Sequence, residues 1–234
     1  MKFFITGANR GLGLALTKIS LQNGGTVFAG VRGIEDAKIE ELLELKENHN
    51  GNLEIIEIDV QSEESVLSAL AQVKEKTKSI DVLINNAAIL NERDKSIEGL
   101  DVEAFKLALD INILGPIRVV KHFLPLLREG ENQSILNISS EAGSLTNAYS
   151  GDYPYGISKA ALNMFSEKLH RYLDDQDIQV LSIHPGWMKT DMGGKNAPFN
   201  PIDTAKSIIE LTERKRKVTH QYVFVDYKGE PMEI

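Results

Sequence analysis

Short runs of Ile, Val, Leu and Phe recur along the chain and alternate with longer segments of helical pattern. The short runs predict strands that are buried on both faces, and the longer segments predict helices. Strands that alternate with helices indicate βαβ units and a parallel sheet. The expected strands are 2–6, 26–31, 53–58, 80–85, 133–139, 178–183 and 221–225, and the expected helices are 12–23, 35–47, 63–77, 101–128, 153–173 and 203–213.

Three aspartates mark expected helix starts. Asp101 and Asp203 suit N-caps, and Asp152 precedes Tyr153-Pro154, where another helix is expected to begin. The chain shows no internal repeat, low-complexity tract or linker, so residues 1–234 are expected to form one domain. In a doubly wound sheet the ligand binds at the carboxyl ends of the strands.

Composition excludes several classes of protein. The 234-residue chain has no cysteine, which excludes disulfides and thiolate ligands, and no metal site is expected. Its net charge of −8 disfavours a nucleic-acid partner. No apolar run reaches the roughly 18 residues of a membrane span, so we expect a cytoplasmic protein with no membrane partner. The basic run 214–217 falls at an expected helix end, where cations complement the helix dipole.

The first expected strand runs into Thr6-Gly7-Ala8-Asn9-Arg10-Gly11-Leu12-Gly13, followed by a helix. A glycine turn between a strand and a helix is typical of pyrophosphate binding, because exposed amides and the helix dipole point at the anion. The G-x-x-x-G-x-G spacing differs from the common dinucleotide fingerprint. An ordinary strand-to-helix turn with helpful glycines is the alternative.

Two arginines indicate which dinucleotide binds. The second expected strand ends in Val31-Arg32-Gly33, without the tip carboxylate that holds the ribose of NAD. A guanidinium at Arg32 or Arg10 binds a 2′-phosphate, so NADP(H) is preferred and NAD(H) is possible; two solvated arginines are the alternative. Asp59, followed by Val60, is expected either to accept from the adenine amine or to cap the next helix.

Tyr155 and Lys159 are four residues apart and therefore share one helix face. Ser140 follows the fifth expected strand, and Ser139 is expected to point to the opposite face of that strand. Asn86 and Ala87 lie at the end of the fourth expected strand. These polar groups therefore meet at the carboxyl edge of the sheet.

Together these motifs resemble the short-chain dehydrogenase/reductase family over essentially the whole chain. The matching residues are Thr6-Gly7 to Gly13, Asp59, Asn85-Asn86-Ala87, Asn112, Ser140, Tyr155 with Lys159, and the stretch from His184 to Gly194. That last stretch further resembles the branch of carbonyl reductases, sniffer and C-factor proteins. The resemblance implies a single-domain, doubly wound Rossmann fold whose seven-stranded parallel sheet has the order 3-2-1-4-5-6-7, with helices on both faces.

The chain departs from the family pattern in two places. Ala88 stands where the family usually has glycine, and the interval from Ser140 to Tyr155 is about two residues longer than in many members. The extra residues fall in 145–152, a loop expected to border the substrate. Neither departure removes a chemical group.

The resemblance implies a role for each catalytic residue. Tyr155 acts as acid and base, because a nearby ammonium lowers the pKa of a phenol. Lys159 supplies that charge and binds the nicotinamide ribose, Ser140 donates to the carbonyl oxygen, and Asn112 holds a water; for Asn112 a buried amide that bends the helix is the alternative. The implied cofactor site consists of Gly7, Asn9, Arg10, Gly11, Leu12, Gly13, Arg32, Asp59, Val60, Asn86, Ala87, Tyr155, Lys159, Pro185, Gly186, Trp187, Met188 and Thr190.

The expected function is that of an NADP(H)-dependent oxidoreductase of carbonyl reductase type acting on a small carbonyl or alcohol. The alternative is a C-factor-like signalling or redox-sensing protein that binds NADP(H) with little turnover. Loops 89–97, 141–154 and 188–201 are expected to border the substrate, the last as a lid. His184 is expected to be structural. The resemblance also implies a possible homodimer or homotetramer formed through helices 101–128 and 153–173.

Overall fold

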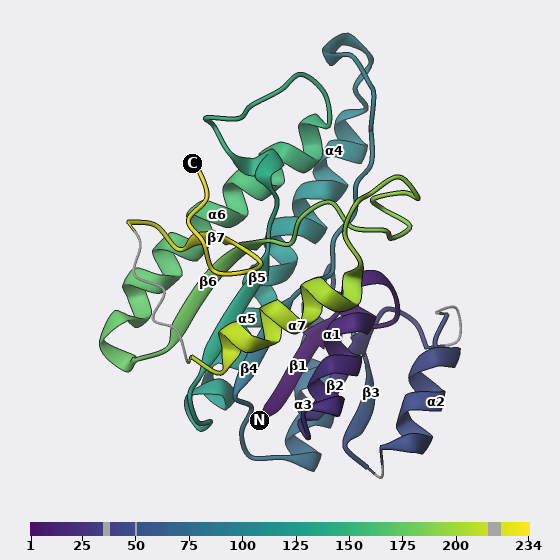
Figure 1. Cartoon of the computed structure of the whole chain (residues 1–234), viewed down its shortest axis with the longest axis vertical. Coiled ribbons are helices and arrows are strands. Elements are labelled where there is room, and N and C mark those ends of the chain that lie inside the picture. Colours follow the sequence, from purple (N-terminus) through teal and green to yellow (C-terminus); the bar gives the residue numbers. More distant parts are fainter. Residues whose placement is uncertain (35–37, 50, 215–220) are drawn as a thin grey trace.

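The computed structural model describes residues 1–34, 38–49, 51–214 and 221–234. Its seven strands form one sheet of order β3-β2-β1-β4-β5-β6-β7, in which every neighbouring pair is parallel (Figure 1). The predicted fold class and strand order are therefore confirmed. The strands are β1 (Lys2–Thr6), β2 (Thr26–Val31), β3 (Leu53–Glu57), β4 (Val82–Asn85), β5 (Ser134–Ile138), β6 (Gln179–His184) and β7 (Phe224–Asp226).

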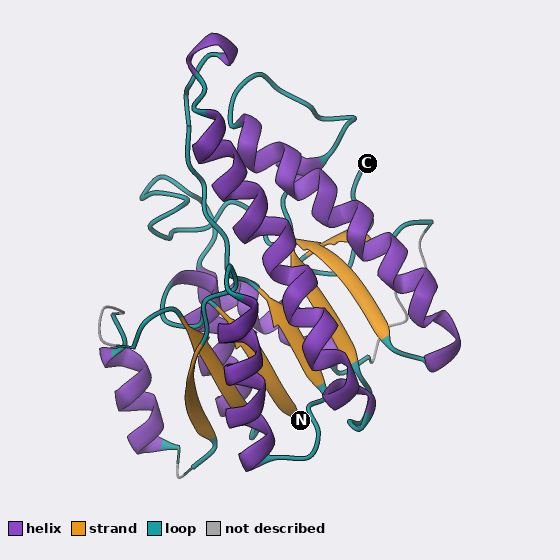
Figure 2. Cartoon of the chain, turned by 180° about the vertical axis from the view of Figure 1, so that it is seen from behind, coloured by secondary structure: helices purple, strands orange, loops and turns teal. Residues whose placement is uncertain are grey.

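Helices cover both faces of the sheet, as a parallel sheet with right-handed crossovers requires. On one face α1 (Gly11–Gln22) packs beside α7 (Pro201–Thr212), and α2 (Glu40–Asn48) lies toward β3 (Figure 1). Figure 2 shows α3 (Glu63–Lys76), α5 (Gly115–Arg128) and α6 (Tyr153–Leu173) over the opposite face. In the same view α4 (Val102–Leu109) precedes α5 along one line and packs beside α6. Three short 3₁₀ turns, η1 (Ile97–Gly99), η3 (Glu141–Gly143) and η4 (Asp174–Gln176), complete the connections.

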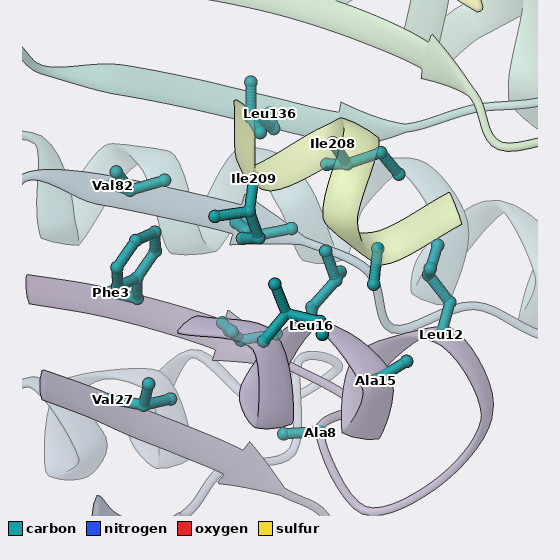
Figure 3. Close-up of a cluster of buried hydrophobic side chains, with 14 of the residues drawn as sticks. Phe3, Ala8, Leu12, Ala15, Leu16, Val27, Val82, Leu136, Ile208 and Ile209 are labelled. Carbon is teal, nitrogen blue, oxygen red and sulfur yellow. The ribbon is translucent and has the colours of Figure 1, made fainter. Parts of the chain in front are cut away.

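The two faces of the sheet carry separate hydrophobic clusters. Because side chains alternate along a strand, Phe3 enters the cluster beneath α1 and α7, whereas Phe4 enters the opposite one. Figure 3 shows Leu16 of α1 beside Ile209 of α7 over the first strands. Burial of these apolar side chains, roughly 1.5–3 kcal/mol each, fixes the strand ends from which the site loops emerge.

The prediction of a single regular α-helix over 101–128 is wrong, because five residues within it form a π-helical turn. Asp110–Leu114, labelled η2, form a π-helical turn between α4 and α5. Gly115 follows, and a Cβ there would lie 2.9 Å from the Val60 side chain, so α5 packs very closely on the chain after β3. The π turn thus separates two helical segments in one continuous rod.

Of the three aspartates predicted at helix starts, only Asp101 caps its helix through a side-chain hydrogen bond. Asp101 does cap α4, since its carboxylate accepts from the Glu103 amide at 2.9 Å. Asp203 does not cap α7; Asn200 accepts from the Ile202 amide instead, because Pro201 suits the first helical position. Asp152 precedes α6 as expected but makes no cap hydrogen bond.

Other boundaries shift by a few residues. The 35–47 helix begins at Glu40, and residues 35–37 lie outside the described residues. The last strand begins at Phe224 rather than at residue 221. Within the basic run, Arg214 binds the carboxylate of Asp177 at 2.6 Å, and the other three residues lie outside the described ranges. Among the helices of the described part, none has the length and apolar character needed to span a membrane.

Candidate active site

The glycine turn between β1 and α1 is a tight cradle that requires its glycines. Gly7 and Gly11 adopt φ values of 65° and 53°, a region that disfavours other side chains. A Cβ on Gly13 would lie 2.1 Å from the carbonyl oxygen of Gly7, so only glycine lets helix and strand pack this closely. Asn9 and the buried Leu12 complete the turn.

The start of α1 presents uncapped backbone amides. Arg10 holds the N-cap position with extended backbone and makes no side-chain cap hydrogen bond, and no acid stands in the first turn of the helix. Such a helix start carries partial positive charge and free donors, which together favour an anion. The cradle therefore fits the pyrophosphate of a dinucleotide.

Thr6 and Asn86 hold the glycine turn in place. The Asn86 amide nitrogen donates to the carbonyls of Thr6 and Gly7 at 3.0 and 3.1 Å. The Thr6 hydroxyl accepts from the backbone amides of Asn86 and Ala87 at 3.0 and 3.1 Å. Asn86 and Ala87 thus tie the end of β4 to the cradle.

The two candidate phosphate-binding arginines are both exposed. Arg32 stands at the tip of β2. Arg10 forms an ion pair with Asp191 at 3.2 Å, which joins the glycine turn to segment 188–201. Because both side chains are largely exposed, this ion pair stabilises the fold by at most about 1 kcal/mol. A phosphate would therefore readily displace Asp191 from Arg10.

Asp59 does not cap the helix that follows it. Its carboxylate accepts from the Gln61 amide at 3.0 Å, and Ser62 caps α3 instead. Val60 is buried against α5. The second expectation for Asp59, as an N-cap, is therefore wrong, whereas acceptance from an adenine amine stays a prediction.

Ser140, Tyr155 and Lys159 meet beyond the end of β5. Ser140 is the N-cap of η3, and Tyr155 and Lys159 lie one turn apart on α6, with the Lys159 Nζ 5.4 Å from the phenol ring centre. Ser140 interacts with the Tyr155 hydroxyl. Ser139 is turned away and donates to Asn163 at 2.6 Å. The three residues predicted from the sequence are thus brought together.

Burial shifts both ionisable groups toward their uncharged forms. Burial raises the pKa of Tyr155, while the Ser140 hydroxyl and the charge of Arg93 lower it. Burial lowers the pKa of Lys159 to about 7, and its Nζ donates to the Ile138 carbonyl at 2.7 Å. A neutral phenol beside a readily deprotonated amine is a pair suited to proton transfer.

Neighbouring Tyr149 is a poor rival to Tyr155. Its hydroxyl donates to the Asp152 carboxylate at 3.1 Å. Burial, followed by the charge of Asp152, raises the pKa of Tyr149 to about 12. Burial raises the pKa of both phenols, so what distinguishes Tyr155 is the lysine four residues on, whose Nζ lies 5.4 Å from the Tyr155 ring centre.

Asn112 lies in the π turn, and its side-chain amide makes three hydrogen bonds. Its nitrogen donates to the Ile89 carbonyl and the Ser158 hydroxyl at 2.9 and 3.0 Å, and its oxygen accepts from the Ile89 amide at 2.9 Å. Asn112 therefore joins the loop after β4 to α6, beside Lys159. Its role in holding a water stays a prediction.

Segment 188–201 folds back beside the glycine turn. Pro185 is buried, and Gly186, at φ 80°, lies against the Phe199 ring. Thr190 packs on Gly11, and the Thr190 hydroxyl accepts from the Gly193 amide at 3.1 Å.

Further contacts lie within the segment and at its start. The exposed Trp187 donates to the Gly193 carbonyl at 2.7 Å, and Met188 forms a β-bridge with Phe199. These contacts give the segment a defined shape along the cradle.

Arg93 is a site residue that the sequence did not reveal. It stands in the loop after β4, donates to the Met192 carbonyl at 3.2 Å and lowers the pKa of Tyr155. A lone arginine in a polar loop gives no periodic or motif signal, because its position depends on how the loop turns. The guanidinium spans the loop after β4 and segment 188–201.

An open surface groove of about 560 Å³ borders the first turn of α6. Residues 94–98 and 149–153 line it, so two of the three predicted substrate loops face each other there. Segment 188–201 contributes no residue to its wall. Tyr155 lies two residues beyond the last lining residue, Tyr153, within electrostatic reach of Asp152.

Fold and site together define an oxidoreductase with a Rossmann-like fold. The family model for short chain dehydrogenases matches residues 2–200, so the chain belongs to the short-chain dehydrogenase/reductase family. Three relatives in sequence or structure are informative.

An uncharacterized oxidoreductase of Schizosaccharomyces pombe is 39% identical over 192 residues, which are 81% of this chain and 74% of that one. The solved carbonyl reductase Sniffer of D. melanogaster is 34% identical, with a TM-score of 0.90 over 100% of this chain and 99% of that one. NADPH-bound carbonyl reductase from chicken fatty liver is 28% identical, again with a TM-score of 0.90, over 100% and 98% of the two chains.

Proposed function

We propose that this oxidoreductase is an NADP(H)-dependent carbonyl reductase in which Tyr155 exchanges a proton with the substrate oxygen. One observation carries the proposal: Ser140, Tyr155 and Lys159 converge at the carboxyl edge of the sheet, beside a cradle that fits a pyrophosphate. Likeness to an NADPH-bound carbonyl reductase supports the choice of cofactor and of reaction.

The cradle would hold the pyrophosphate through the amides of Gly11, Leu12 and Gly13, and Arg10 or Arg32 would bind the 2′-phosphate. When bound, the nicotinamide supplies the hydride. The remaining proposed contacts lie along the same edge: Gly7, Asn9, Asp59, Val60, Asn86, Ala87, Tyr155, Lys159, Pro185, Gly186, Trp187, Met188 and Thr190. NAD(H) stays possible as a weaker ligand.

In reduction, Tyr155 donates its proton to the carbonyl oxygen and Ser140 donates a hydrogen bond to the developing oxyanion. Burial keeps the phenol protonated, since it raises the pKa of Tyr155. The charges of Lys159 and Arg93 stabilise the phenolate that remains. The substrate would enter from the open groove of about 560 Å³, and segment 188–201 would close over the substrate as a lid.

Turnover with a panel of aldehydes, ketones and quinones tests this proposal. Wild type is expected to oxidise NADPH, and Tyr155→Phe to lose 10²–10⁴-fold in rate, the usual share of one acid–base group. Tyr172→Phe, an exposed tyrosine on the same helix, serves as the control. Loss of the NADPH preference over NADH in Arg10→Ala or Arg32→Ala would locate the 2′-phosphate.

A signalling or redox-sensing role is the second candidate. It is favoured by 34% identity to the C-signal protein of Myxococcus xanthus over 154 residues, which are 65% of this chain and 92% of that one. Tight NADPH binding without turnover on any carbonyl would support this role and contradict the reductase.

A further inference from the structure

His184 ends β6 and supports the turn that carries Ser140. Its Nδ1 accepts a hydrogen bond from the backbone amide of Glu141 at 3.1 Å. Only 14% of its side chain is exposed. The proposed proton transfer uses no group on His184, so the hydrogen bond from Glu141 to His184 has a role outside that step.

The supported turn is η3, which stands between the sheet and α6. Ser140 caps the turn by accepting from the Ala142 amide at 3.1 Å, and it also interacts with the Tyr155 hydroxyl. Gly143 lets the turn press on α6, because a Cβ there would lie 2.6 Å from the backbone of Lys159. The bond from Glu141 to His184 therefore fixes the same turn from the sheet side.

The hydrogen bond exists only with an unprotonated Nδ1. A backbone N–H is a donor, and Nδ1 can accept from it only in the neutral ring that carries its proton on Nε2. Protonation would place one N–H against another and leave the Glu141 amide without its acceptor. The charged groups that face the ring are Glu141, 4.0 Å from Nε2, and Asp226, its register partner on β7.

We propose that His184 is a positioning residue: its neutral imidazole holds the Ser140 turn against Tyr155, and its protonation releases the turn and slows carbonyl reduction in acid. The inference rests on the proposed function. Reduction needs a protonated Tyr155 and is helped by a charged Lys159, and acid favours both forms. A loss of rate on the acid side therefore has to come from another group.

Burial, which outweighs the two carboxylates, lowers the pKa of His184 below its ordinary value of 6.5. The acid-side loss should accordingly begin below pH 6.5. At neutral pH the turn is held and the site is intact.

Two substitutions of His184 separate its role in positioning the Ser140 turn from the effect of its protonation. In His184→Asn the amide Oδ1 can accept in place of Nδ1 but does not titrate, whereas His184→Leu offers no acceptor. For wild type, kcat for reduction should fall along a single titration curve below the His184 pKa and level off about tenfold lower, the worth of the same hydrogen bond. His184→Asn should keep the wild-type kcat at pH 7.5 and flatten the acid limb. His184→Leu should lose about tenfold in kcat, the worth of one such hydrogen bond, with KM for NADPH unchanged.

An unchanged acid limb in His184→Asn, or a wild-type kcat in His184→Leu, would overturn the proposal. A measurement without turnover covers variants that fold poorly. In NMR spectra of wild type, the Glu141 amide should shift along the same titration curve as the His184 ring, and it should stay flat in His184→Asn. If the two signals titrate together but wild type has no activity, the proposed reductase function is contradicted and the hydrogen bond between Glu141 and His184 is supported. If wild type is active but the Glu141 amide does not titrate with the His184 ring, only the inference about His184 is contradicted.

Discussion

Tyr155 and Lys159 show how burial prepares individual residues for proton transfer. The phenol stays neutral because burial raises its pKa, and the lysine, with a pKa lowered to about 7, is charged in only part of the molecules at neutral pH. Their helical spacing is visible in the sequence, so both could be predicted. Their burial, and the Arg93 charge beside them, depend on loops and could not.

Replacing Arg93 by glutamine should move the pH dependence of alcohol oxidation. Oxidation needs the phenolate, and the Arg93 charge lowers the pKa of Tyr155. Arg93→Gln should therefore raise that pKa and shift the rising limb of the oxidation profile to higher pH. Arg171→Gln is the control, because Arg171 is exposed and stands about 24 Å further along α6. Equal profiles for wild type and Arg93→Gln would exclude this charge effect.

Lys159 should make the stability of the fold depend on pH. Its folded pKa of about 7 lies below the unfolded value near 10.4, so above pH 7 the unfolded chain binds more protons. The free energy of unfolding of wild type, relative to Lys159→Met, should rise by up to about 1.4 kcal/mol per pH unit between pH 7 and 10. Urea unfolding at several pH values measures this.

The exposed Lys168 on α6 provides the matched comparison. Lys168→Met should unfold with the same pH dependence as wild type. A difference between wild type and Lys159→Met that stays flat from pH 6 to 9 would show that the folded state does not deprotonate Lys159 early.

At the scale of elements, the local sequence signals succeeded where local geometry decides the structure. Asp101 caps α4 because its carboxylate reaches an amide two residues on, which the sequence pattern describes well. The π turn at Asp110–Leu114 gave no such signal, because it depends on the tertiary bonds of Asn112 to Ile89 and Ser158. Asn200 replaced Asp203 as a cap because both are good caps and Pro201 decided between them.

The strand-to-helix turn at Gly13 offers a test at this scale. Gly13→Ala puts a Cβ 2.1 Å from the Gly7 carbonyl oxygen, so strand and helix must separate. Overpacking of this kind costs about 1–3 kcal/mol, which should lower Tm by roughly 2–12 °C and abolish NADPH binding. Thermal unfolding and a binding titration measure both effects.

Gly99→Ala is a suitable control for that variant. A Cβ at Gly99 would meet only the Ser96 hydroxyl, at 3.5 Å. This variant should keep the wild-type Tm and cofactor affinity. Wild-type NADPH affinity in Gly13→Ala would mean that the cradle is not the pyrophosphate site.

At the scale of the molecule, the alternation of strands and helices was enough to predict a parallel sheet, whereas the order of its strands and the association with further copies were predicted only by resemblance. The surface supports that prediction on α6, where the exposed apolar residues Ile157 and Met164 are seven positions apart. Residues seven apart share a helix face. We expect two chains to pair through this face.

Sedimentation measures this association directly. Wild type should have a mass of at least twice 26.0 kDa, and the double variant Ile157→Glu/Met164→Glu should sediment as a monomer with its fold retained. Leu67→Glu, an exposed leucine on α3, should not change the mass. A wild type of 26.0 kDa at all concentrations would exclude the pairing.

The central claim is that hydride reaches a carbonyl carbon while Tyr155 supplies the proton. The most direct test is a single-turnover reaction with NADPH that carries deuterium in place of both hydrogens at C4, followed by mass spectrometry of the alcohol product. The account predicts deuterium on the carbinol carbon with wild type and almost none in the same time with Tyr155→Phe. Bound NADPH that keeps its deuterium against every carbonyl offered, or an unimpaired Tyr155→Phe, would contradict it.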